Sequence, residues 1–250
     1  MPRNWFILTI GAFTLAATLG SNGRAEDGAT LRSKYVRVEG VLNPLAVERE
    51  CDAIVARLVE RYGVPRRWKT FPVRFRRPNG GPVAGYTAYA RPDVAEIVLY
   101  MTFEESRGGA LDHELTHAFF FYYLDDYFDL FFNEGVAQNS ETANRARLRG
   151  EVYRRFARGE TTSLARLYGR NEYDPELLLY VQGFSVVDYL IGRGGSRWFA
   201  AFLDELTNGN VGLDDALRRF YDCESLDALE REWREYVRNG QDRLGTRAVK

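Results

Sequence analysis

Hydrophobic and polar residues alternate in short segments of the first third of the chain. A period of two residues is typical of strands that bury one face. The segments run from Tyr35 to Glu39, Phe71 to Arg76, Val83 to Ala88 and Glu96 to Met101. Between the first two segments, apolar residues from Val47 to Tyr62 recur at helical spacing instead. The pattern predicts a small, mostly antiparallel sheet with one helix over residues 26–108.

Residues that favour helix ends flank this helix. Asn43 stands before Pro44, and an asparagine side chain accepts hydrogen bonds from the first free N–H groups while proline suits the first helical position. Gly63 and Pro65 follow the last apolar residue. We therefore expect the helix to begin at Pro44 and to stop at Gly63.

From Gly109 onward the apolar residues follow a helical period, and no strand pattern returns. Breaks between helices are predicted where turn-forming residues cluster. They fall near Asp125-Asp126, Arg149-Gly150, Tyr173 to Pro175, Gly192 to Gly195, Asn208-Gly209 and Asp222 to Ser225. Asp174 and Ser225 are expected to cap the helices that follow them. Strands followed by helices, the latter over 109–250, indicate the α+β class in a single functional unit.

The formal net charge is -1. A chain without an overall basic field is not expected to bind nucleic acid. One basic run lies between Arg66 and Arg77, but Val73 and Phe75 alternate with its arginines. We interpret this run as the solvated face of a strand.

The N-terminal residues have the composition of an export signal. Trp5 to Leu19 are almost all apolar, and Gly23-Arg24-Ala25 offers small residues for cleavage. We predict a signal peptide over 1–25, so that the mature chain is exported, periplasmic or secreted, without a stable membrane anchor. A membrane anchor is the alternative, although the apolar stretch is shorter than the ~20 residues that span a bilayer.

The chain has two cysteines, Cys51 and Cys223. An even number in an oxidising compartment permits one disulfide between them. Two buried thiols are the alternative, because the sequence does not supply the distance between the two residues.

Both histidines of the chain stand in one motif, His113-Glu114-Leu115-Thr116-His117. Residues four apart on a helix face the same way, so both imidazoles are placed to bind one metal ion. Glu114 lies about 100° round the helix from His113, where a carboxylate suits the role of general base beside the metal. A structural hydrogen-bonding role for these side chains is the alternative.

A catalytic zinc site usually has three protein ligands, and no third histidine remains. The metzincin pattern is excluded because Phe120 and Tyr123 stand where it has Gly and His. Sixteen residues separate His117 from Glu134, which is embedded in an apolar segment. A helical hairpin would place Glu134 across from the histidines, so we predict it as the third ligand.

Together, the motif at His113 and the segment Asn133-Glu134-Gly135-Val136-Ala137 resemble the gluzincin, or peptidase MA-like, zinc metallohydrolases. The resemblance implies a zincin-like fold and a Zn²⁺ cofactor held by the two histidines and Glu134, with Glu114 as general base. The segment Tyr180-Val181-Gln182-Gly183 is similar to the Tyr-x-x-Gly segment of gluzincin aminopeptidases. This similarity implies that Tyr180 hydrogen-bonds the oxyanion of the reaction.

Alternatives to Tyr180 remain in Tyr168, Tyr173 and Tyr189, and a core tyrosine is a further interpretation. Gly81 to Tyr89 lacks the Gly-x-Met-Glu-Asn loop with which the aminopeptidases grip a free amino terminus, so aminopeptidase activity is not expected. Glu96 to Tyr100 resembles the gluzincin strand that pairs with an extended substrate.

The aromatic residues from Phe119 to Phe132 are expected to pack in the core, with a side-chain pocket as the alternative. The hypothesis for function is zinc-dependent hydrolysis of peptide bonds in a peptide or protein substrate, by an endopeptidase acting outside the cytoplasm. The alternative is a catalytically silent binding module on the same fold. Retention of Glu114 favours the enzyme, because a scaffold for zinc needs the ligands but not the base.

Overall fold

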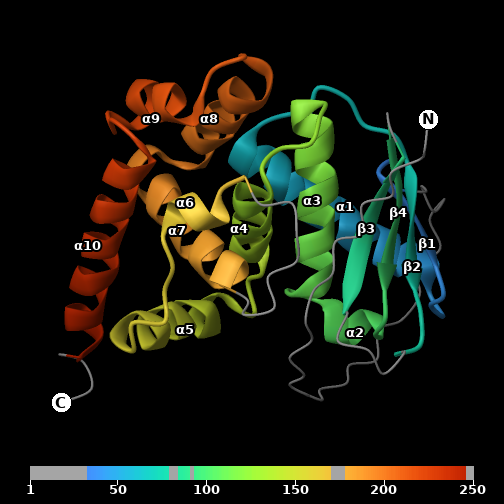
Figure 1. Ribbon diagram of the computed structural model, residues 1–250. Coiled ribbons are helices and arrows are strands. Elements are labelled where there is room, and N and C mark those ends of the chain that lie inside the picture. The colour runs from blue at the N-terminus through green and yellow to red at the C-terminus, as the bar shows by residue number, and fades with distance from the viewer. Residues whose placement is uncertain (1–32, 79–83, 91–92, 170–177, 246–250) are drawn as a thin grey trace.

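The computed structural model describes residues 33–78, 84–90, 93–169 and 178–245. In this part of the chain a four-stranded sheet is followed by helices, which confirms the α+β class. Helix α3 (Ala110–Leu124) stands between the sheet and the later helices (Figure 1). The predicted signal peptide and the predicted cap Asp174 lie outside the described residues and stay predictions.

The sheet is mixed, and most of its strand pairs are parallel. Its strands follow the order β1-β2-β4-β3. Strand β2 runs parallel to both β1 and β4, and only β3 and β4 pair in the antiparallel sense. The bounds are β1 (Val36–Glu39), β2 (Phe71–Phe75), β3 (Gly85–Ala90) and β4 (Asp93–Leu99). The expectation of a mostly antiparallel sheet is therefore wrong.

The helix between the first two strands explains their direction. A strand, helix, strand connection carries the chain back to the end where it started, so the two strands run the same way. Helix α1 (Pro44–Tyr62) makes this connection and packs on β1. The side chain of Asn43 accepts a hydrogen bond from the N–H of Ala46, and Gly63 ends the helix with a φ of 113°. Both predicted ends of this helix are confirmed.

The helical part agrees with most of the predicted breaks. The helices are α2 (Phe103–Ser106), α4 (Leu130–Ser140), α5 (Arg145–Ala157), α6 (Leu164–Leu167), α7 (Leu178–Gly194), α8 (Ser196–Asn208), α9 (Leu213–Tyr221) and α10 (Leu226–Gly245). The break at Gly150 is wrong, because α5 continues through it. A glycine inside a helix costs only about 1 kcal/mol, and Leu148 and Val152 on either side are buried.

Helix α3 is buried on nearly every side, which suits a helix that contacts the sheet, α1 and α4 together. Its aromatic residues fill the core: the ring of Phe120 contacts Tyr62 of α1 with centroids 5.0 Å apart, and Tyr122 contacts Trp68 at 4.9 Å. Phe131 and Phe132 of α4 are also fully buried. Core packing of this aromatic run is confirmed.

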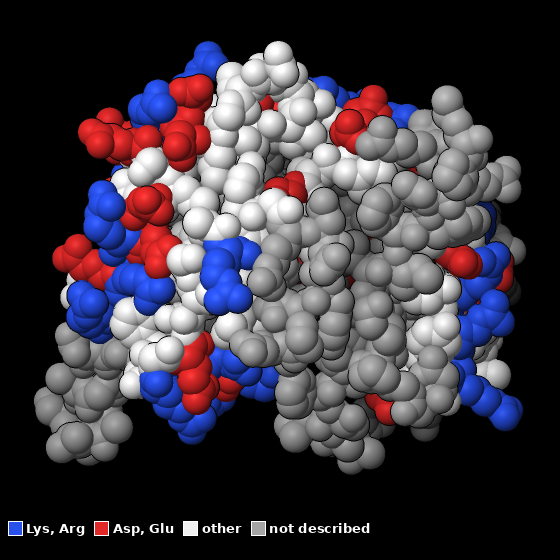
Figure 2. Space-filling model, in the orientation of Figure 1, with Lys and Arg blue, Asp and Glu red and all other residues white. Residues whose placement is uncertain are grey.

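Four charged residues of the basic run after α1 pair with acidic side chains. Arg66 pairs with Asp204, Arg67 with Asp125 and Lys69 with Asp93, while Arg74 pairs with Glu39 and Glu96. Figure 2 shows basic and acidic side chains interleaved over α5, α9 and α10. The run is therefore an ion-paired, solvated face, as predicted. No helix within the described residues combines the length and the apolar character that crossing a membrane requires.

Cys51 and Cys223 are both buried and both free. Cys51 lies on α1, whereas Cys223 follows α9, where its thiol contacts the carbonyl oxygen of Ser225. The disulfide permitted by the even count is therefore absent, and the alternative of two buried thiols is correct. Each side chain serves as a small apolar group in the core.

Candidate metal centre

The two histidines lie one turn apart on α3 and face the same space. His113 is 0% exposed and His117 is 1% exposed, and their ring centroids are 4.6 Å apart. The helix can hold them there because α3 is packed on several sides, so its polar face is enclosed rather than solvated. The helical spacing of the motif thus brings both rings to one point, as predicted.

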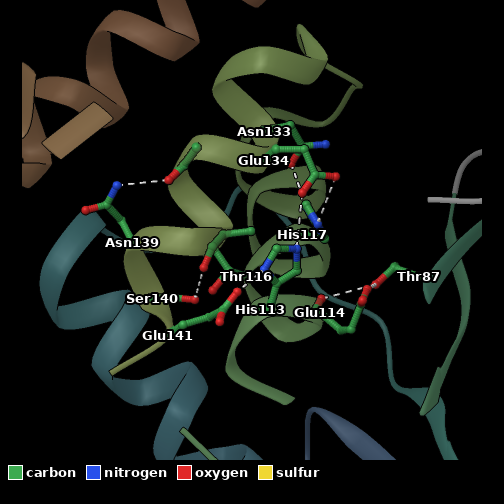
Figure 3. Close-up of polar contacts among 12 residues, drawn as sticks. Thr87, His113, Glu114, Thr116, His117, Asn133, Glu134, Asn139, Ser140 and Glu141 are labelled. Atoms are coloured by element: carbon green, nitrogen blue, oxygen red, sulfur yellow. Dashed lines mark hydrogen bonds and ion pairs between the residues drawn. The ribbon is translucent and has the colours of Figure 1, made fainter. Parts of the chain in front are cut away.

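Glu134 reaches the same point from α4. Asp129 caps this helix by accepting a hydrogen bond from the N–H of Phe131, and the chain returns alongside α3. One carboxylate oxygen of Glu134 lies 3.3 Å from Nε2 of His113, and the other lies 3.7 Å from Nε2 of His117. Ligand atoms of the three residues all lie within 4.8 Å of one another, and Figure 3 shows the side chains converging. The three predicted ligands therefore form one group.

Unpartnered atoms distinguish this group from an ordinary buried polar cluster. Both Nε2 atoms and both carboxylate oxygens of Glu134 are buried without a hydrogen-bond partner. Leaving one such group unpartnered typically costs about 1–3 kcal/mol, so four in one place are unfavourable in a core that binds nothing. Two neutral imidazoles and one carboxylate are suitable donors for a divalent metal ion. The residues present thus fit a metal ion.

A second layer of side chains fixes the orientation of both rings. Nδ1 of His113 lies 2.7 Å from a carboxylate oxygen of Glu141, and Nδ1 of His117 lies 2.8 Å from the side-chain oxygen of Asn133. An Nδ1–H that donates to such an oxygen leaves the lone pair on Nε2 free to bind a metal. The other oxygen of Glu141 accepts a hydrogen bond from Asn144.

Sequence reasoning missed Glu141 and the role of Asn133. A signal was present, because Glu141 follows Glu134 by seven residues, about two helical turns, and comes directly after the last residue of α4. Asn133 precedes Glu134 directly. Neither pattern indicates by itself which imidazole each side chain would contact.

Burial and neighbouring carboxylates act in opposite directions on the two imidazoles. Burial lowers the pKa of His113, but the nearby carboxylates of Glu134 and Glu141 outweigh it and raise the pKa to about 10. For His117 burial dominates and lowers the pKa to about 4. His117 is therefore neutral near pH 7, whereas His113 carries a proton that a bound cation would displace.

Glu114 lies beside this group on α3 and is 0% exposed. The hydroxyl of Thr87, on β3, donates a 2.6 Å hydrogen bond to Oε2 of Glu114, while Oε1 has no partner. Burial raises the pKa of Glu114 to about 7. The chain thus holds one oxygen of this carboxylate in place and leaves the other free to accept a proton.

Two glycines bring α4 and α7 into close contact. A Cβ atom on Gly135 would lie 2.5 Å from the carbonyl oxygen of Gly183, and one on Gly183 would lie 2.8 Å from that of Phe131. The glycines of the two motif segments therefore pack backbone against backbone. Tyr180, one turn before Gly183, is 8% exposed. Its role toward the oxyanion stays a prediction.

The sheet corrects the predicted substrate strand. Glu96 to Tyr100 falls mostly in β4, which lies between β2 and β3 and pairs with both. A strand with two neighbours has no free edge for a substrate backbone. Within the described residues the edge strand next to α3 is β3, which carries Thr87 (Figure 1). Part of the segment Gly81 to Tyr89 lies outside the described residues.

Comparison with protein-family models, with curated proteins and with solved structures finds no match to this chain.

Proposed function

We propose that this protein is an exported, gluzincin-like endopeptidase that hydrolyses peptide bonds with the help of zinc. The observation that carries the proposal is the set of five buried atoms without hydrogen-bond partners: the two Nε2 atoms, both oxygens of Glu134 and Oε1 of Glu114. Four of them suit a metal ion. The fifth suits a base for the water that attacks the substrate.

Zinc is the metal that the donor set favours. Two imidazole nitrogens and one carboxylate are a usual ligand set of catalytic zinc sites, which keep a further position open. Hard oxygen-binding cations such as magnesium and calcium prefer sites without imidazole. When bound there, zinc supplies Lewis-acid chemistry that lowers the pKa of water to about 7 and polarises a carbonyl group.

Glu114 takes the proton of the attacking water on its free oxygen, Oε1. The hydrogen bond from Thr87 to Oε2 limits rotation of the carboxylate and leaves Oε1 without a protein donor. A raised pKa, caused by burial, suits a base that must accept a proton and later release it near neutral pH. Tyr180 is proposed to donate a hydrogen bond to the oxygen that becomes negative.

An extended peptide is the substrate form that fits the sheet. Strand β3 is an edge strand within the described residues, and it packs against the helix that carries the two histidines. Addition of the substrate as a further strand on β3 would bring its backbone past Thr87 and Glu114. The predicted signal peptide supports an action outside the cytoplasm.

The test is cleavage of a quenched peptide that is blocked at both ends, so that only hydrolysis of an internal bond is detected. Glu114→Gln should retain zinc and fold but lower turnover by about 10² to 10⁴-fold, the usual contribution of a general base. Glu104→Gln, on an exposed side chain of α2, is the matched control and should cleave as wild type does.

Equal cleavage by Glu114→Gln and wild type would contradict the proposed mechanism. Zinc binding without cleavage of any member of a broad peptide library, by wild type, would favour the binding module over the enzyme. A metal analysis on the same samples separates these two results from loss of the metal.

A further inference from the structure

An open cavity lies away from the metal centre, where the C-terminal end of α1 meets the loop before α8. Its volume is about 590 Å³, and none of the metal-centre residues lines it. This volume falls within the range of about 300–1,000 Å³ that is usual for small-molecule sites. The cavity is therefore large enough for an organic ligand and independent of the proposed hydrolysis.

Its lining is strongly positive. Arg57, Arg61 and Arg197 face it, against a single carboxylate from Glu60. The side chain of Arg57 is 55% exposed and, among the described residues, pairs with Asp112 at 3.2 Å. Arg197 donates one long bond to the backbone oxygen of Glu60. Because each guanidinium has five N–H donors, most donors of these two arginines remain available to a ligand.

Arg61 is held in position by the protein and closes the inner side of the cluster. Its Nε donates to the hydroxyl of Ser196 at 3.1 Å, and its guanidinium lies over the ring of Tyr62 at 5.0 Å. A fixed guanidinium loses little freedom when it binds an anion. The cluster thus combines one rigid arginine with two that can adjust.

The backbone of the loop adds to the same field. Gly195 has a φ of 84°, and a Cβ atom there would meet nothing within 4 Å, so the loop backbone is open to the cavity. Gly195 caps α8, a helix of 13 residues, without any side-chain cap. The first N–H groups of such a helix attract anions. Trp198 lines the remaining wall and is 46% exposed, which offers an apolar surface beside the charged groups.

We propose that this cavity binds a phosphorylated small molecule, with the phosphoryl group on Arg57, Arg61 and Arg197 and its organic part against Trp198. A phosphoryl group presents three oxygens and about two negative charges, which matches several guanidinium groups better than a single carboxylate does. The site needs no metal ion, so its test is independent of the proposed peptidase activity.

The test is isothermal titration calorimetry of the mature protein with phenyl phosphate, inorganic phosphate and benzoate at constant ionic strength. Phenyl phosphate should bind most tightly, inorganic phosphate more weakly, and benzoate least. The double variant Arg57→Gln/Arg197→Gln should bind phenyl phosphate at least about tenfold more weakly, since two charge-assisted contacts are lost. Arg166→Gln/Arg238→Gln removes the same charge from exposed positions and should bind as wild type does.

Absence of phenyl phosphate binding to wild type, or equal binding by the Arg57→Gln/Arg197→Gln variant, would overturn the proposal. An equal loss in both double variants would assign the binding to overall charge and would also overturn it. Equal affinity for phenyl phosphate and inorganic phosphate would overturn the proposed contact between the organic part of the ligand and Trp198, and would indicate a site for free phosphate. Unfolding temperatures of the variants without ligand show whether a loss of binding reflects a loss of folding.

Discussion

Two buried carboxylates of the helical part have opposite surroundings. Asp188 of α7 is 8% exposed, and its oxygens lie 2.7 Å from Arg145 and 3.0 Å from Arg149 of α5. Glu134 of α4 is 0% exposed, and neither of its oxygens has a hydrogen-bond partner. It faces two imidazole nitrogens that lack partners as well.

The difference distinguishes a carboxylate that the protein pairs with its own arginines from one that belongs to a group able to hold a metal ion. At Asp188 the protein itself supplies the positive charge, because Arg145 and Arg149 of α5 form ion pairs with this carboxylate of α7. At Glu134 the described residues supply no hydrogen bond to either oxygen, while Glu141 and Asn133 contact the Nδ1 atoms of the two imidazoles that Glu134 faces. Buried polar groups that a fold leaves unsatisfied in this way indicate a ligand.

After Glu114→Gln, the largest effect on turnover is expected from Tyr180→Phe. Loss of one oxyanion donor typically costs about 2.7–4 kcal/mol of barrier, or about 10² to 10³ in turnover, while zinc and substrate binding persist. Tyr189→Phe, further along α7, removes a hydroxyl that bonds Glu232 and is the matched control. Steady-state kinetics on the blocked peptide measures the turnover of both variants. Unchanged turnover in Tyr180→Phe would show that this tyrosine has a packing role and no catalytic one.

A smaller effect, on metal affinity, is expected from Glu141→Ala. Removal of the partner of Nδ1 leaves His113 less well oriented, and loss of such a partner usually weakens metal binding about 10- to 100-fold. Competition with a chelator measures the affinity. Glu151→Ala, which removes a carboxylate paired with Arg154 and Arg155, should leave the affinity unchanged. Equal zinc affinity in the two variants would mean that Glu141 has no role in positioning the ring.

The smallest effect on the metal centre is expected from Asp188→Asn. The free energy of unfolding should fall by about 1.5 kcal/mol, the lower end for hydrogen bonds to charged groups, because the two arginines are 34% and 49% exposed. Zinc content and turnover should not change. Urea unfolding measures the first quantity, and a loss of zinc in this variant would remove the contrast between the two carboxylates.

The grouping of His113, His117 and Glu134 could be predicted because it depends on local geometry. A spacing of four residues on a helix places His113 and His117 on the same face, whatever surrounds the helix. A turn at Asp125 is enough to bring the next helix, with Glu134, back alongside them. The direction of the strands depends on how α1 crosses the sheet, and periodicity alone does not contain this information. Strand β4 pairs with β2, which leaves β3 at the edge of the sheet. Periodicity does not contain the strand order either, so the prediction of Glu96 to Tyr100 as the substrate strand is wrong.

Long-range contacts explain the other differences. The contact between Glu141 and His113 depends on the packing of α4 against α3, which the spacing of Glu141 from Glu134 does not specify. Gly150 was predicted to break a helix, but burial of Leu148 and Val152 outweighs a local preference of about 1 kcal/mol. The two cysteines allowed a disulfide by number, whereas in the structure both are free and buried in the core.

The most direct test of the account is the zinc content of three mature proteins after dialysis: wild type, Glu134→Gln and Asp188→Asn. Each substitution replaces a buried carboxylate by an amide of the same size, so only the role of the carboxylate differs. We predict one zinc per chain in wild type and in Asp188→Asn, and a strongly reduced content in Glu134→Gln that is still folded by circular dichroism. Full zinc retention by folded Glu134→Gln, or the absence of zinc from wild type purified with zinc present, would contradict the metal centre.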